Sequence, residues 1–120
     1  MSVRYLAIRR ACDELWEREM CMRTNNSGGV LTLFPEGHVD SKNAGDFERD
    51  VMEALDSAPG TSVVFDVNEL DYISSAGLRV LMKVMRRSKD TVKVINASTD
   101  VYEIFEVTGF SEMMDVTKRS

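Results

Sequence analysis

The stretch from Ser62 to Leu81, SVVFDVNELDYISSAGLRVL, predicts a strand, a turn and the start of a helix. Its first part, Ser62–Val67, is rich in β-branched and apolar residues without strict alternation, which is typical of a strand covered on both faces. Apolar residues then recur at helical spacing at Leu78, Leu81, Met82 and Met85. We therefore expect the middle strand of a sheet, followed by a helix that begins near Ser75 and ends by Asp90.

Two strands and a helix are predicted before this stretch. Glu19–Thr24 leads into the turn-forming cluster Asn25–Gly29, and the apolar strand Val30–Pro35 follows, closed by its proline. Ser41 can then cap a helix that stops at Pro59. The apolar residues of this helix are Phe47, Val51, Ala54 and Leu55.

Another strand, a third helix and a last strand are predicted after it. Thr91–Ile95 has the composition of a strand, and the helix that follows closes at Gly109, a residue suited to a left-handed C-terminal cap. One face of that helix carries Val101, Ile104, Phe105 and Thr108. Met113–Val116 predicts a short final strand. This alternation of strands and helices predicts an α/β fold with a mostly parallel sheet.

The first residues form a separate amphipathic segment. Between about Val3 and Met20, apolar residues lie at helical spacing among charged ones, at Ile8, Cys12, Leu15 and Trp16. We expect an N-terminal amphipathic helix over residues 1–18 and a second unit over residues 19–120. The helix would pack on that domain or on another molecule, and a homodimer is one such arrangement.

The composition is that of one globular domain. The 120 residues are 43% apolar and 29% charged, which excludes a disordered chain. No stretch approaches the ~20 apolar residues of a membrane span, and the start lacks the apolar core of a signal peptide, so we expect a cytoplasmic protein. The net charge of −5 argues against nucleic-acid binding. With two cysteines and one distant histidine, we expect no disulfide framework, metal site or cofactor.

Ser74 and Ser75 stand where the predicted turn becomes a helix. The unpaired N–H groups and the positive dipole end of a helix N-terminus favour an anion. A phosphoryl group on either serine would therefore change the surface charge while the fold is kept. The simpler interpretation is that a serine here only caps the helix.

Three pieces of the sequence together resemble one family. Gly37–Asp40 is similar to that family's Gly-x-Leu-Asp, Ile73–Leu81 to its Asp-Ser-Ser/Thr-Gly-Leu, and Val101–Phe110 to its third helix and the glycine that ends it. On these residues the chain, over about residues 19 to 118, resembles STAS domains, the fold of bacterial anti-sigma factor antagonists. The resemblance implies a mixed sheet of four to five strands with helices mainly on one side, to which the N-terminal helix is an addition.

The resemblance also implies a function. In antagonist members, an anti-sigma factor with serine kinase activity phosphorylates the hydroxyl residue two positions before the glycine. The unmodified domain binds the anti-sigma factor and so frees the sigma factor; phosphorylation breaks the complex and a serine phosphatase restores it. Counting back from Gly77 gives Ser75, with Ser74 as the second choice. The chain departs from the pattern in having Ser74 in place of the aspartate and Ala76 in place of the second hydroxyl.

Several other residues are candidates for contact with that partner. Asp40 would lie beside the serine turn in the family's layout, although an Asx turn leading to the first helix is an equal alternative, and Asn68 has the same two interpretations. The second helix has a basic outer face on which we expect an exposed Val80, and such a face either suits an acidic partner or is merely solvated. The predicted partner-binding residues are Asp40, Asn68, Ser74, Ala76, Gly77, Arg79, Val80 and Lys83.

Two other functions compete with this one. A serine hydrolase needs a glycine two residues before and two residues after its nucleophile, but Ile73 stands two residues before Ser75. The chain also has a single histidine, His38, so the usual parts of a catalytic site are missing. We therefore expect no enzyme activity. The second alternative is a non-switching STAS interaction subunit of a larger complex, such as a stress-signalling scaffold or lipid-transport machinery. A switch loses binding when Ser75 is phosphorylated or replaced by aspartate, whereas a scaffold is indifferent.

Overall fold

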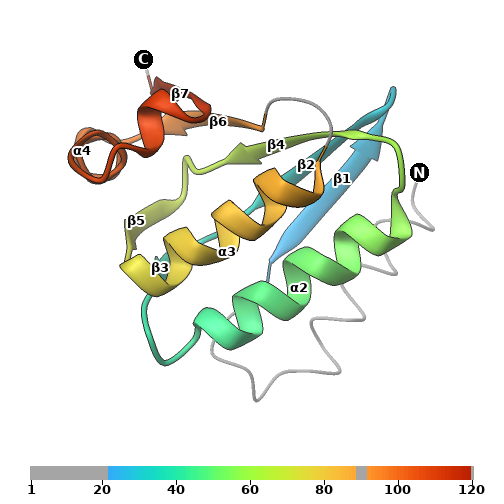
Figure 1. The fold of residues 1–120 in the computed structure, drawn as a ribbon, viewed down its shortest axis with the longest axis horizontal. Helices are drawn as coiled ribbons and strands as arrows, with labels where there is room; N and C mark the ends of the chain where they lie inside the picture. Colours follow the sequence, from blue (N-terminus) through green and yellow to red (C-terminus); the bar gives the residue numbers. More distant parts are fainter. Residues whose placement is uncertain (1–21, 89–91, 120) are drawn as a thin grey trace.

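The computed structural model describes residues 22–88 and 92–119, which form a five-stranded sheet, a separate pair of strands and three α-helices (Figure 1). In spatial order the main sheet consists of β1 (Arg23–Ser27), β2 (Val30–Phe34), β4 (Ser62–Asp66), β6 (Lys93–Ala97) and β7 (Asp115–Lys118). β1 is antiparallel to β2 and the other neighbours are parallel, which confirms the predicted mixed sheet of five strands. The predicted N-terminal helix over residues 1–18 lies outside the described residues.

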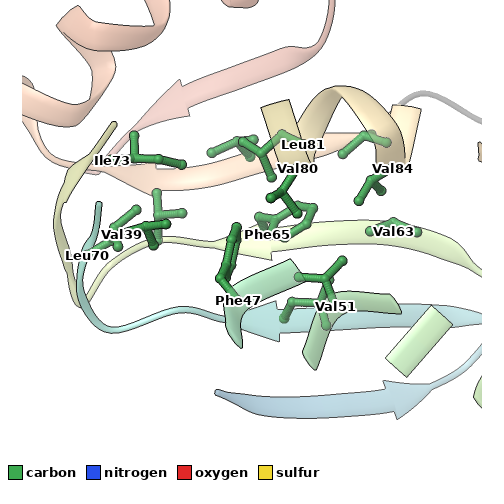
Figure 2. Packing of buried hydrophobic residues seen from close by; sticks show 14 of the residues in the cluster. Val39, Phe47, Val51, Val63, Phe65, Leu70, Ile73, Val80, Leu81 and Val84 are labelled. Atoms are coloured by element: carbon green, nitrogen blue, oxygen red, sulfur yellow. The ribbon is translucent and has the colours of Figure 1, made fainter. Parts of the chain in front are cut away.

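The core lies between the main sheet and two helices, α2 (Ala44–Ser57) and α3 (Ser75–Arg87), which run side by side over the same face (Figure 1). Phe47 of α2 meets Phe65 of β4, the central strand, with ring centroids 6.5 Å apart. Figure 2 shows Val80 and Leu81 of α3 reaching the same layer. All four side chains are at most 2% exposed. The prediction that Ser62–Val67 is the middle of the sheet is confirmed.

The hairpin between β1 and β2 is tighter than predicted. Asn25, Asn26 and Ser27 belong to β1, and only Gly28 and Gly29 form the turn, with φ angles of 60° and 79°. A two-residue hairpin turn matches the right-handed twist of its strands when both of its residues have positive φ. Because the glycines make the whole turn, the polar residues before them pair with β2, and the predicted turn over Asn25–Gly29 is wrong in its first three positions.

Two short strands, β3 (Gly37–Val39) and β5 (Leu70–Ile73), pair in parallel outside the main sheet. Neither strand was predicted. Val39 pairs with Ile73, and the next N–H, that of Ser74, donates to the Val39 carbonyl at 2.8 Å. This small sheet therefore fixes the serine turn beside the loop that follows β3.

The third helix, α4 (Thr99–Val107), packs against β5, β6 and β7 and ends as predicted. Gly109 has φ 82°, the left-handed conformation expected of a C-terminal cap. A short 3₁₀ turn, η1 (Phe110–Glu112), follows, and its Phe110 meets Phe105 edge to face at 6.3 Å. These contacts hold the C-terminal part of the chain on the domain.

Candidate functional site

The structure gives the two adjacent serines different roles. Ser74 is the N-cap of α3: its backbone is extended, and its Oγ accepts the N–H of Gly77 at 3.4 Å. Ser75 is the first residue of the helix and is exposed, whereas Ser74 is partly buried. The Ser74 hydroxyl is therefore engaged in the cap, and the Ser75 hydroxyl faces solvent where another protein can reach it.

Gly77 lets the first turn of α3 approach the small sheet closely. A Cβ atom at this position would lie 2.7 Å from a methyl carbon of Val39 and 2.7 Å from a side-chain carbon of Ile73. Both neighbours are buried, so neither can swing away easily. Gly77 is therefore needed for packing, and Ala76, which precedes it, is partly buried.

Asp40 builds the turn that leads into α2. Its Oδ1 accepts the N–H groups of Lys42 at 2.9 Å and Asn43 at 3.1 Å, and its own N–H donates to Asn43 Oδ1 at 2.8 Å. Asn43, which is buried, is the N-cap, so α2 begins at Ala44 and the predicted cap at Ser41 is wrong. The reason is that the Asp40 side chain takes the N–H groups that Ser41 would otherwise have organised. Asp40 thus forms an Asx-type turn and also lies next to the serine turn, directly after Val39.

The pKa of Asp40 is lowered from its usual value. The main cause is the N–H of Asn43, helped by the N–H of Lys42 and by the positive charges of His38 and Lys42, against a smaller opposing effect of burial. His38 Nε2 lies 3.2 Å from Asp40 Oδ2. Because folding favours the ionised carboxylate, this stabilisation is complete above the unfolded pKa, near 3.8, and is lost as the pH falls through the lower folded pKa.

We expect Asp40→Asn to reduce the acid sensitivity of the domain. An asparagine keeps an oxygen that accepts the two N–H groups but cannot be protonated there. The difference in free energy of unfolding between the wild type and the variant should shrink as the pH falls below about 3.8. Urea unfolding at a series of pH values measures it. A difference that stays constant down to complete acid unfolding would contradict this assignment.

The outer face of α3 is basic, but Val80 does not belong to it. Val80 is 2% exposed, and the prediction that it is an exposed apolar residue is wrong. It lies three residues after Gly77 and four before Val84, both buried, and so on the core side of the helix. Arg79 and Lys83 are exposed as predicted.

Two of the basic side chains join α3 to α2. Lys83 Nζ lies 2.9 Å from Glu48 Oε2, and Arg87 forms an ion pair with Asp56. Exposed pairs of this kind contribute little to stability. They neutralise two of the four basic side chains of α3, which weakens the idea of a broad positive docking surface. Among the described residues, Arg86 contacts only the sulfur of Met82, and Arg79, beside the serine turn, has no such partner.

Asn68 lies apart from the other candidate residues. Asn68 precedes β5, whereas the serine turn follows β5. The four extended residues of this strand span about 13 Å and keep Asn68 away from the serines. Its N–H donates to Asp66 Oδ1 at 3.1 Å, and its carbonyl accepts from Arg119 at 2.8 Å. The structure thus brings together Asp40, Ser74, Ser75, Ala76, Gly77 and Arg79, while Asn68 belongs to a turn tied to the C-terminal strand.

Sequence reasoning missed one exposed aromatic residue beside the serine turn. Tyr72 of β5 is 49% exposed and pairs across the small sheet with His38 of β3. An exposed aromatic side chain is a common anchor in protein interfaces. Tyr72 stands three residues before Ser75 in the sequence. Its exposure could not be predicted, because β5 has only four residues and shows no alternation of apolar and polar side chains.

Within residues 22–88 and 92–119, no helix is both long and apolar enough to cross a membrane, and no group of three or more histidine, cysteine, aspartate or glutamate side chains is placed to hold a metal ion. The candidate site consists of the exposed Ser75 hydroxyl, the Ser74 cap and the turn at Asp40, with the exposed Arg79 one helical turn further on.

A sequence profile of the STAS domain matches residues 22–120, which is most of the chain and includes every residue of this site. The chain belongs to the STAS domain family. A candidate anti-sigma factor antagonist of Bordetella bronchiseptica, BtrV, is 35% identical over 91 residues, which are 73% of this chain and 78% of BtrV. Antagonists of this family are binding proteins and not enzymes.

Solved structures share the fold of this STAS domain at low identity. An anti-sigma factor antagonist from Mycobacterium paratuberculosis is 18% identical with a TM-score of 0.73, over 82% of this chain and 85% of that one. Unphosphorylated SpoIIAA is 15% identical with a TM-score of 0.66, over 81% and 88%. Phosphorylated SpoIIAA of Bacillus is 14% identical with a TM-score of 0.59, over 81% and 91%. At these identities the likeness concerns the fold alone.

Proposed function

We propose that this STAS domain is a cytoplasmic, phosphorylation-switched antagonist of an anti-sigma factor. In the unphosphorylated form it binds the anti-sigma factor, and the sigma factor is released. The serine kinase activity of the anti-sigma factor transfers the γ-phosphoryl group of ATP to Ser75 Oγ, with loss of the hydroxyl proton and release of ADP. A serine phosphatase hydrolyses the phosphoester and restores binding.

The observation that carries this proposal is the exposure of Ser75 at the first position of α3, beside a serine whose hydroxyl is already used in the cap. A kinase needs an accessible hydroxyl, and Ser75 offers one without any change in the fold. The 35% identity to BtrV supports the antagonist role. The two forms of SpoIIAA support the idea that this fold tolerates a phosphate.

Phosphorylation would act on a surface that has the features of a docking site. Tyr72 and Arg79 are both exposed and flank Ser75 along the chain, Tyr72 three residues earlier on β5 and Arg79 one turn later on α3. An aromatic side chain and an arginine are the residue types most enriched at interface hot spots. A phosphate of charge about −2 at the centre of such a surface must be desolvated or repelled when the partner docks.

The test is the intact mass of the chain after incubation with ATP and the anti-sigma factor kinase of the same organism. We expect the wild type and Ser74→Ala to gain one phosphate and Ser75→Ala to gain none. Ser74→Ala loses the N-cap and about 1 kcal/mol of stability, so it is assayed well below its unfolding temperature. Stable binding with no phosphate on any variant would overturn the switch and favour the non-switching STAS subunit.

A further inference from the structure

Arg79 lies one helical turn after Ser75. Residues i and i+4 of an α-helix are neighbours on its surface, with Cβ atoms about 5–6 Å apart. Both residues belong to α3 and both are exposed. An arginine is long enough to bring its guanidinium group onto a phosphate attached at the earlier position.

The Arg79 guanidinium is also available. Lys83 and Arg87, further along α3, are engaged with Glu48 and Asp56 of α2. Arg79 makes no ion pair or hydrogen bond with any residue in the described part of the chain. Among the basic side chains of the helix, it is the one nearest to Ser75 in sequence.

We propose that phosphorylation of Ser75 draws Arg79 onto the phosphate, so that a single modification both adds negative charge to the docking surface and removes its exposed cation. The inference rests on the proposed function and extends it to the regulation of the same site. Arginine binds phosphate through two parallel N–H donors, which makes this pair stronger than one with lysine. The order, anion first and cation four residues later, is the favourable one on a helix.

The other charged groups near the turn are less suited to this role. Asp40 and Asp71 are carboxylates and repel a phosphate. His38 is held by Asp40 at 3.2 Å, and Tyr72 offers one hydroxyl donor in place of a cationic group. Lys42, which is exposed in the Asp40 turn, is the remaining cation. Arg79 is the expected partner because it lies on the same helix as Ser75, one turn later. Lys42 is the main competitor to be tested, and His38 is the second.

The experiment uses the full chain with phosphoserine inserted at position 75 during synthesis, so that no kinase is needed. Phosphorus NMR is recorded as a function of pH to give the second pKa of the phosphate, ordinarily near 6. We expect Arg79→Gln to raise this pKa by about half a unit, since a neighbouring cation favours the dianion. Arg79→Lys should retain part of the effect.

Lys83→Gln is the matched control, because it removes the same charge one turn further along α3 and should shift the phosphate pKa by much less. Equal shifts for Arg79→Gln and Lys83→Gln, or no shift for either, would overturn the pairing, as would a larger shift for Lys42→Gln or for His38→Asn. The phosphate is installed without a kinase, so the two proposals can fail separately. A raised phosphate pKa in Arg79→Gln, together with no phosphate gained from the kinase, would refute the switch and leave the pairing of Arg79 with the phosphate intact.

Discussion

Gly77→Ala is expected to lower the free energy of unfolding by about 1–2 kcal/mol. An added methyl group would lie 2.7 Å from buried carbons of Val39 and Ile73, and overpacking of this kind typically costs about 1–3 kcal/mol. Part of this loss is offset, since alanine has a higher helix propensity than glycine. The first turn of α3, which carries Ser75, must move away from the small sheet. Urea unfolding measures the loss through the midpoint.

Gly45→Ala is the matched control for this variant. Gly45 also lies in the first turn of a helix, α2, but a Cβ atom there meets nothing within 4 Å. We expect this change to be neutral or stabilising by up to about 1 kcal/mol. Val39→Ala combined with Gly77→Ala should cost less than the sum of the two single changes, because Val39 supplies one of the two clashes. A Gly77→Ala protein as stable as Gly45→Ala would contradict the close approach.

Ser75→Asp is expected to weaken binding to the anti-sigma factor at least about tenfold, or 1.4 kcal/mol, while leaving the fold intact. A carboxylate in the first turn of a helix interacts favourably with its dipole, so the stability of the domain should not fall. The same charge must be desolvated when the partner covers the serine turn. Titration calorimetry with the purified anti-sigma factor gives the affinity, and urea unfolding gives the stability.

Ser27→Asp provides the matched control for binding. Ser27 is exposed and belongs to the hairpin at the end of the main sheet opposite to the serine turn (Figure 1). The same change of charge there should leave the affinity unaltered. If Ser75→Asp bound as tightly as Ser27→Asp, the switch would be refuted and the domain would act as a scaffold.

Much of the fold was predictable because its strongest signals are local. The central strand, the start of α3 and the cap at Gly109 each follow from a few neighbouring residues. The small sheet was not predictable in this way, because strands of three and four residues show no period and their pairing joins segments about 30 residues apart. Their register, in turn, places Ser74 against Val39, the residue directly before Asp40.

Two errors about the site have a similar physical origin. The apolar stripe through Leu78 and Leu81 predicts an outward Val80, but α3 contacts both α2 and β5, so the buried face of this helix is wider. The sequence predicts Ser41 as the cap of α2, yet the side chain of Asp40 organises that turn instead. In both cases a tertiary or side-chain contact outweighed a local preference.

The chain enters and leaves the main sheet on the side of the serine turn. Arg23 begins β1 beside Phe34, the last residue of β2, and Lys118 pairs with Ala97 at the end of β6. The Gly28–Gly29 turn lies at the opposite end of the strands. A fluorescent protein or affinity tag joined next to Arg23 or Lys118 would crowd the surface that the proposed partner needs. A label or surface attachment at the glycine turn would leave that surface open.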